Sequence, residues 1–126
     1  MRRTPLRRMR ERVTGDDMLA VLAALANPHR LRVLAALQAE GRSYVSQLAR
    51  RIGISRPLLH LHLQKLEAAG LVTSAFEVSE DGKALKFFTV ADFSLTLSPE
   101  VLAEAAATLT VSAPADRTPK SDAQSN

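Results

Sequence analysis

The stretch SQLARRIGISRPLLHLHLQKLEAAGLV, which runs from Ser46 to Val72 of this 126-residue chain, decides the fold. Gly53 interrupts an apolar pattern of helical period in the way that a left-handed C-terminal cap ends a helix. Ser55 is a typical N-cap for the helix that follows. The sequence therefore predicts a short helix from about Tyr44 to Ile52 and, after a tight turn, a second helix that ends at Gly70. The expected inward positions are Val45, Leu48, Ile52, Leu59, Leu63 and Leu66, with His62 in part.

Two further helices are predicted before this pair. Asp16 and Asp17 favour a helix start, because a carboxylate accepts free backbone N–H groups and suits the positive end of the helix dipole. Pro28 disfavours helical geometry at Asn27 but fits a first helical position, so one helix ends and another begins there. Gly41 closes the second helix. The expected apolar stripes are Met18, Leu22 and Leu25, then Leu31, Leu34 and Leu37.

After the second helix of the pair, the apolar period changes from about 3.6 to 2, which predicts strands. Residues 71–78 and 84–90 flank the segment Ser79–Gly82, whose Asp-Gly pair favours a hairpin turn. Phe87 and Phe88 point to opposite faces of such a strand. We therefore expect one of them in the core and the other against a neighbouring element.

Ser98 is the expected cap of a last helix that continues to about Leu109. The predicted order is thus α-α-α-α-β-β-α, a mainly α fold with a small β-hairpin (α+β). The hairpin follows the second helix of a helix-turn-helix and so forms a wing. We expect one ordered domain over residues 15–110, a basic disordered arm over 1–14 and a disordered tail over 111–126, since both ends lack core-forming side chains.

The composition excludes several classes of protein. The absence of Cys excludes disulfides, thiolate zinc sites and a cysteine nucleophile. No apolar run approaches the ~18 residues of a membrane span, and no apolar region of a secretory signal follows the basic N-terminus. We therefore expect no membrane partner and a cytoplasmic location. We expect no enzyme, because the sequence shows no Gly-rich phosphate loop, nucleophile elbow or workable His–carboxylate constellation.

The charge of the chain is concentrated in two segments. The net charge is +4, but residues 1–12 carry six Arg against one Glu, and residues 42–66 carry five basic side chains and no acidic one. A basic stripe inside a folded segment is typical of a polyanion partner, although a solvated helix face is the alternative. A helix about 10–12 Å wide fits the major groove of B-DNA, which is also about 12 Å wide. The pattern predicts sequence-specific binding to double-stranded DNA.

Three motifs resemble one known family. LANPHRLRVLAAL (Leu25–Leu37) resembles a signature of the ArsR/SmtB-type winged-helix repressors. The opening stretch is similar to the helix-turn-helix of that family, and DGKALKFFTV (Asp81–Val90) resembles its wing. The likeness covers about residues 17–92, with the motifs in the order of the family.

The resemblance implies a homodimeric transcriptional repressor that a signal releases from its operator. A two-fold dimer would set two recognition helices about 34–36 Å apart on a near-palindromic site. The family's dimer interface uses the first and last helices, which agrees with an excess of apolar side chains there. The expected interface residues are Leu19, Val21, Leu22, Val101, Leu102, Ala105 and Leu109.

The expected DNA contacts surround the helix-turn-helix. Ser55 and Arg56 open the recognition helix, where backbone N–H groups favour a phosphate. Gln64 could read adenine, whereas Leu58 and Leu61 stand where the family more often has polar residues. These leucines indicate either readout through phosphates and DNA shape, or a protein-contact surface. The full predicted set is Arg42, Arg50, Arg51, Ser55, Arg56, Leu58, His60, Leu61, Gln64, Lys65, Lys83 and Lys86.

The sequence predicts no cofactor and no usual metal site. Many relatives sense metals through cysteines on the third helix, but the matching stretch here is SYVSQL (Ser43–Leu48). Others use Asp and His pairs on the last helix, which has Glu100 and Glu104 but no His. His29 is expected at the surface and His62 as a packing or phosphate group. Two alternatives remain open: an atypical nickel or zinc sensor with a site at the dimer interface, and a winged-helix protein-interaction module.

Overall fold

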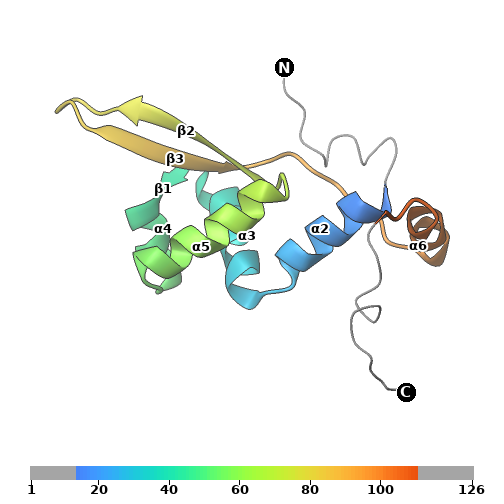
Figure 1. Ribbon diagram of the computed structural model, residues 1–126. Helices are drawn as coiled ribbons and strands as arrows, with labels where there is room; N and C mark the ends of the chain where they lie inside the picture. The colour runs from blue at the N-terminus through green and yellow to red at the C-terminus, as the bar shows by residue number, and fades with distance from the viewer. Residues whose placement is uncertain (1–13, 111–126) are drawn as a thin grey trace, which may run out of the picture.

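The helices and strands of the computed structural model, which describes residues 14–110, follow the predicted order with one addition (Figure 1). The predicted arm and tail lie outside the described residues, apart from Thr14, which is the N-cap of the first helix. The elements are α2 (Gly15–Leu25), α3 (Pro28–Glu40), β1 (Ser43–Tyr44), α4 (Val45–Ile52), α5 (Arg56–Ala68), β2 (Val72–Val78), β3 (Ala84–Val90) and α6 (Pro99–Ala106).

The addition is β1, a two-residue strand that the sequence did not predict. Ser43 pairs with Phe88 and Tyr44 with Phe87, so β1 joins the hairpin in a three-stranded antiparallel sheet of order β1-β3-β2. Two residues are too short for a period to show in the sequence. The expectation for the two phenylalanines is confirmed. Phe88 is buried, and Phe87 lies edge-on to the Tyr44 ring, with 5.5 Å between the ring centroids.

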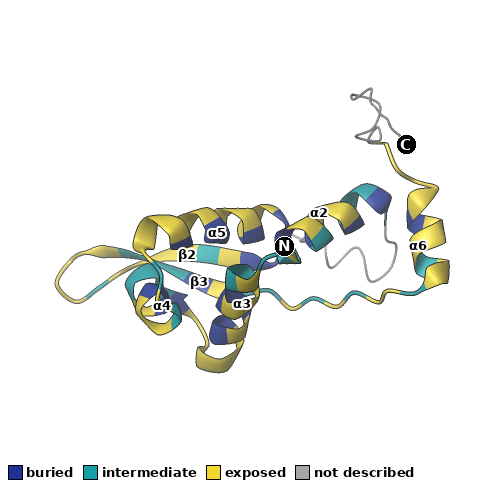
Figure 2. Ribbon diagram, turned by 90° about the horizontal axis from the view of Figure 1, so that it is seen from below, coloured by how far each residue is buried: buried dark blue, intermediate teal, exposed yellow. Residues whose placement is uncertain are grey.

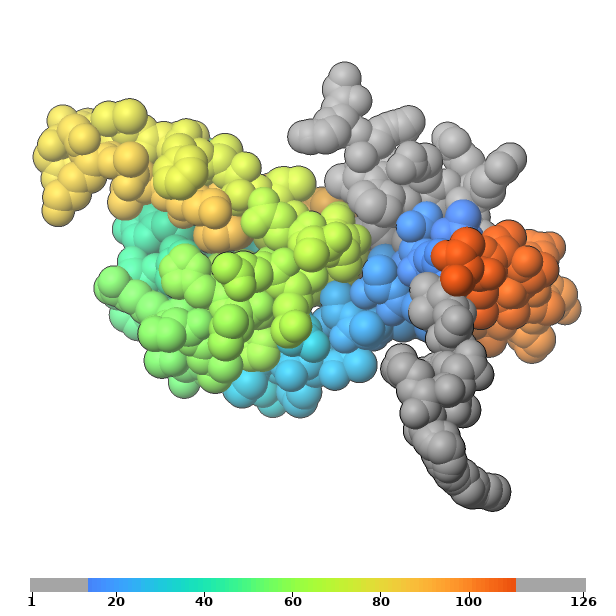
Figure 3. Space-filling model, in the orientation of Figure 1, coloured from blue at the N-terminus to red at the C-terminus, as the bar shows by residue number. Residues whose placement is uncertain are grey.

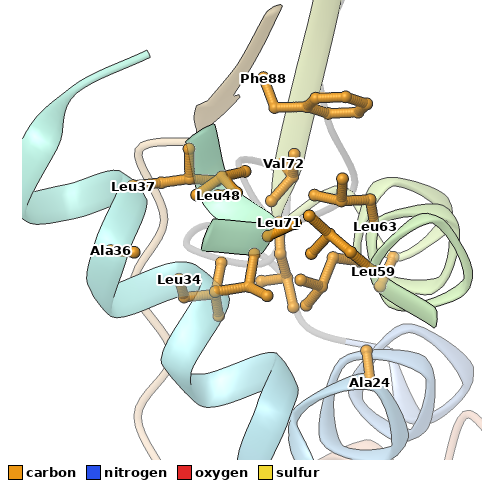
Figure 4. Close-up of a cluster of buried hydrophobic side chains, with 14 of the residues drawn as sticks. Ala24, Leu34, Ala36, Leu37, Leu48, Leu59, Leu63, Leu71, Val72 and Phe88 are labelled. Atoms are coloured by element: carbon orange, nitrogen blue, oxygen red, sulfur yellow. The ribbon is translucent and has the colours of Figure 1, made fainter. Parts of the chain in front are cut away.

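The hydrophobic core lies between the sheet and α3, α4 and α5. In Figure 4, Leu59 and Leu63 of α5 converge with Leu37 of α3 and with Leu48 of α4, below Phe88. These leucines are at most 1% exposed. Burying each such side chain stabilises the fold by roughly 1.5–3 kcal/mol relative to leaving it in water. The inward positions predicted for the recognition helix are therefore confirmed.

The predicted apolar stripes of the two preceding helices are partly wrong. In α2 the buried positions are Met18, Val21 and Ala24, whereas Leu22 is half-buried. In α3, Leu31 is 54% exposed, and the core takes Val33, Leu34, Ala36 and Leu37 instead. Both helices carry apolar residues at nearly every angle, so the spacing alone does not fix which face turns inward.

Helix α6 lies far from the wing, at the other end of the molecule, and contacts the start of α2 (Figure 1). The backbone N–H of Gly15 donates to Oγ1 of Thr108 at 2.7 Å, and Thr110 N–H donates to Asp16 Oδ1 at 3.1 Å. Ser98 caps α6 as predicted, since its Oγ accepts from Val101 N–H at 3.1 Å. The helix is shorter than expected and ends at Ala106. Among the described residues, no helix is long and apolar enough to cross a membrane.

Candidate nucleic-acid interface

A glycine shapes the turn between α4 and α5. Gly53 has φ +84° and ψ 34°, a left-handed conformation that costs glycine little. Its N–H donates to Ala49 O at 2.8 Å, and the next N–H, from Ile54, reaches the same oxygen at 3.2 Å. Ile54 packs against the core. These contacts fix the direction in which α5 leaves α4, and the left-handed cap that the sequence predicted at Gly53 is confirmed.

Helix α5 presents one face to solvent (Figure 2). Ser55 Oγ accepts from Leu58 N–H at 3.3 Å, which confirms the predicted N-cap. Arg56 follows at the exposed helix start. Because each residue turns the helix by about 100°, Leu61 and Gln64 lie opposite the buried leucines. Both are exposed, so their side chains are free to enter a groove.

The two flanks of α5 face different parts of the molecule. On one flank Glu67 accepts a hydrogen bond from Ser74 of β2, at 2.8 Å, so the wing lies on that side. His60 shares this flank. The other flank faces α2 and α3 and carries Lys65. Leu58 lies on the same flank, two helical turns before Lys65, and is 37% exposed. The predicted DNA contacts on α5 therefore divide between a wing side and a side that faces away from the wing.

Two of the five basic residues in the segment 42–66 are paired with carboxylates. Arg42 pairs with Glu77 of β2, and Arg51 pairs with Glu40 of α3. The hydrogen bond from Arg42 lowers the pKa of Glu77 below its ordinary value, and the same bond raises the pKa of Arg42. The segment 42–66 contains no acidic residue, but in the folded chain Glu77 and Glu40, from outside this segment, lie against its arginines. Arg50 and Arg56 are exposed and lie on α4 and α5.

The wing mixes basic, acidic and aromatic side chains. Lys86 Nζ lies 5.6 Å from the ring centroid of Phe76 and 5.4 Å from that of Phe88, both within cation–π range. Lys83 is exposed just after the turn. At the tip, a hydrogen bond from Ser79 lowers the pKa of Asp81, so this carboxylate stays ionised. The tip is therefore less favourable to phosphates than Lys83 and Lys86 alone suggest.

Arg30, for which the sequence predicted no role, connects α2 with α5. Its Nε donates to Ala24 O at 2.6 Å, at the end of α2, and its Nη1 lies 3.2 Å from Nδ1 of His62 in α5. His62 is 7% exposed, and burial, then the charge of Arg30, lower its pKa below the ordinary value. Packing is thus the role of His62. The ring of His29 lies 5.6 Å from that of His62 and its Nδ1 is buried, so His29 is half-buried, with one edge of its ring turned inward.

The residues predicted for the dimer interface divide into two groups. Val21 is 1% exposed and belongs to the core, and Ala105 is 3% exposed where α6 contacts Gly15 of α2. Both side chains are buried within the single chain, and their place in a dimer interface stays a prediction. The backbone brings α2 and α6 together within one chain, which buries the positions between them. Exposed on these helices and just beyond α6 are Leu19, Leu102 and Leu109, while Leu22 and Val101 are half-buried.

Within one chain, residues 14–110 contain no group of three or more His, Asp or Glu side chains that could hold a metal ion. Glu100 and Glu104 of α6 are both exposed. The stretch from Ser43 to Leu48 supplies a strand, a cap and a core leucine, and no thiolate or carboxylate.

The tight turn, the exposed face of α5 and the adjacent wing define a winged helix-turn-helix protein. Residues 25–75 match a family model described as a helix-turn-helix domain. The chain is 31% identical over 86 residues to the uncharacterised HTH-type transcriptional regulator MJ0229 of Methanocaldococcus jannaschii. The matched region covers 68% of this chain and 88% of that protein. It is 43% identical over 54 residues to the regulator CmtR of Mycobacterium bovis, which covers 43% of this chain and 45% of CmtR.

Solved structures show the same fold. The homodimeric winged helix-turn-helix DNA-binding domain Mb0332 of Mycobacterium bovis, described as a possible ArsR-family transcriptional regulator, superposes with a TM-score of 0.54 at 28% identity. The match covers 70% of this chain and 69% of that one. HlyU of Vibrio cholerae gives a TM-score of 0.52 at 28% identity, over 73% and 87% of the two chains. The chain belongs to the ArsR family of DNA-binding winged helix-turn-helix transcriptional regulators and is not an enzyme.

Proposed function

We propose that this regulator is a homodimeric repressor that binds a near-palindromic operator, with α5 of each subunit in the major groove. The observation that carries the proposal is the exposed surface of α5 next to the wing, which includes Arg56, His60, Leu61 and Gln64. Arg at a helix start suits a phosphate, and Gln forms bidentate contacts with adenine. Arg50 of α4 and Lys83 of the wing supply further phosphate contacts on the same proposed surface.

The dimer is proposed from exposed apolar side chains that the core does not use. Leu19 of α2 is 50% exposed, and Leu102 and Leu109, in and just beyond α6, are 47% and 41% exposed. These two helices lie together at the end of the molecule opposite the wing (Figure 3). An isologous contact there would bury the leucines and leave both copies of α5 outward. The homodimer described for Mb0332 supports this assembly.

A mobility shift with the DNA upstream of the chain's own gene tests the proposal. Binding at low salt that falls steeply as salt rises is the expected result, because phosphate contacts release counterions. Light scattering should give twice the 13.7 kDa mass of one chain, and Leu102→Ser should lower that mass and weaken operator binding together. Transcription from the bound promoter should fall when the protein is added. Absence of binding at low salt overturns the DNA function, and a 13.7 kDa particle at micromolar concentration overturns the dimer.

One observation favours a second candidate, a winged-helix protein-interaction module. Leu61 is 55% exposed on α5, and Phe76 and Val78 are 69% and 74% exposed on β2, where solvent-facing apolar residues suit a protein partner. The same mobility shift separates the two functions, since a protein-interaction module shows no salt-dependent DNA binding.

A DNA-binding regulator acts where the chromosome is, so we place the protein in the cytoplasm of a bacterium or archaeon.

A further inference from the structure

A hollow lies between α2 and α5, on the flank of the recognition helix that faces away from the wing. Its volume is about 450 Å³. In Figure 3 the two helices meet along a seam on the face toward the viewer, α5 in green and α2 in blue. The wall is made of small side chains from both helices: Ala20, Ala23, Ala24, Ala68 and Ala69.

Two cations complete the wall of this hollow, Arg30 from α3 and Lys65 from α5. Among the described residues, no acidic side chain lines it. Arg30 donates from Nε to Ala24 O, its Nη1 contacts His62, and its Nη2 lies 3.4 Å from Ala23 O. A guanidinium has five N–H groups, so Arg30 keeps further N–H groups with which to bind a ligand. Lys65 is exposed and adds three donors. The hollow therefore combines two positive charges with an apolar wall.

We propose that this hollow binds a small organic carboxylate, with Arg30 and Lys65 holding the carboxylate and the alanine methyl groups packing against its apolar part. Guanidinium and ammonium groups form strong charge-assisted hydrogen bonds with carboxylates. Ligand sites typically enclose about 300–1,000 Å³ and combine an apolar lining with a few polar groups, and this hollow has both features. Such a site shares Lys65 with the predicted DNA contacts, but it lies apart from the face of α5 proposed for the operator and from the leucines proposed for the dimer.

Arg30 connects this site to the recognition helix. Its guanidinium bonds the end of α2 and, through Nη1, reaches Nδ1 of the buried His62 in α5. A carboxylate that binds the remaining N–H groups of Arg30 shifts this guanidinium and so changes how α5 packs against α2. The ligand would thereby alter operator binding, and this consequence rests on the proposed function. The binding of the ligand to the hollow does not depend on that function.

Methyl NMR of the full chain labelled with ¹³C-methyl alanine tests the binding. Benzoate is the probe, and benzamide is its neutral control of the same shape. Saturable benzoate shifts at the methyl groups of Ala23, Ala24 and Ala69, absent with benzamide, are the expected result. Inorganic phosphate should bind more weakly, because it lacks an apolar part. Equal shifts with benzamide, equal binding of phosphate, or no saturable shift overturns the proposal.

Variants separate this site from general charge attraction. Lys65→Gln should weaken benzoate binding about tenfold. The matched control Lys83→Gln, which removes the same charge from the wing, should leave it unchanged. Ala23→Leu should block binding by filling the hollow while keeping every charge. If both lysine variants weaken benzoate binding equally, or if Ala23→Leu binds benzoate fully, the proposal is overturned. Because the readout is benzoate binding, this result does not depend on whether the protein binds an operator.

Discussion

Arg42 and Glu77, which lie 35 positions apart, form a bidentate ion pair between the residue before β1 and the outer end of β2, with Nη2 donating to Oε1 at 2.7 Å. The same guanidinium lies 4.2 Å from the centroid of the Phe87 ring, so its position is fixed from two sides. A cation held in this way is not free to meet a phosphate. The pair therefore competes with DNA for the first basic residue of the helix-turn-helix segment.

Glu77→Gln should strengthen DNA binding at low salt, because it releases Arg42 to a phosphate. One added phosphate contact steepens the log–log dependence of affinity on salt by about 0.9. Glu80→Gln at the wing tip is the matched control, since it removes the same charge without releasing an arginine. Salt titrations by fluorescence anisotropy compare the two. Identical slopes for both variants would show that Arg42 contacts no phosphate.

Arg56 and Gln64 should contribute to operator binding in different ways. Arg56→Gln should weaken binding to all DNA sequences and reduce the salt slope by about 0.9, if Arg56 contacts a phosphate. Gln64→Ala should cost about 1–3 kcal/mol on the operator alone and relax the base preference at one position. Competition with operators carrying single substitutions measures both. Uniform loss across sequences for Gln64→Ala would show that this residue does not read a base.

Val21 and Leu19 should separate folding from assembly. Val21→Ala should lower the free energy of unfolding by about 2 kcal/mol, because it opens a cavity in the core. Leu19→Ser should leave the monomer core intact and act through the dimer, since Leu19 is half exposed. Urea unfolding at two protein concentrations distinguishes these effects. If the loss of unfolding free energy in Val21→Ala disappears at high protein concentration, Val21 lies in the dimer interface.

Gly15→Ala should detach α6 from α2. A Cβ on Gly15 would lie 2.3 Å from the backbone oxygen of Ala105 and 2.5 Å from Leu109 Cδ2, which is closer than contact allows. Alanine is otherwise the better helix former, by about 1 kcal/mol, so any loss reflects the clash. Amide hydrogen exchange should become faster in α6 and stay unchanged in α5. Unchanged exchange in α6 would contradict the close contact.

Local signals in the sequence predicted much of the fold. The caps at Ser55 and Ser98, the left-handed Gly53 and the two hairpin strands are set by neighbours within a few residues, and all are confirmed. Strand β1 escaped prediction because a strand of two residues depends on a distant partner, Phe87–Phe88.

The candidate site was less predictable, because it depends on contacts between distant segments. The acids that pair with Arg42 and Arg51 come from outside the basic stretch, so a local count of charges misses them. Arg30 stood in a recognised motif, but its contacts with the end of α2 and with His62 exist only once three helices pack together. In α2, a run of apolar residues hid that Val21 turns inward.

His62 should make the stability of the fold depend on pH. Burial, together with the charges of Arg30, His29 and Lys65, holds the pKa of His62 below its ordinary value of about 6.5. As the pH falls below about 6.5, the unfolded chain binds a proton at this site that the folded chain does not. The free energy of unfolding therefore falls with decreasing pH, by at most about 1.4 kcal/mol per pH unit from this group, until the folded pKa is reached.

Urea unfolding between about pH 5 and pH 7.5 measures this dependence. His62→Asn keeps a carbonyl acceptor for Arg30 and cannot titrate, so its unfolding free energy should change less with pH than that of the natural protein. His60→Asn, on the exposed side of the same helix, should retain the natural slope. A natural slope in His62→Asn, or a loss of slope in His60→Asn alone, would show that the buried imidazole beside Arg30 is not the titrating group.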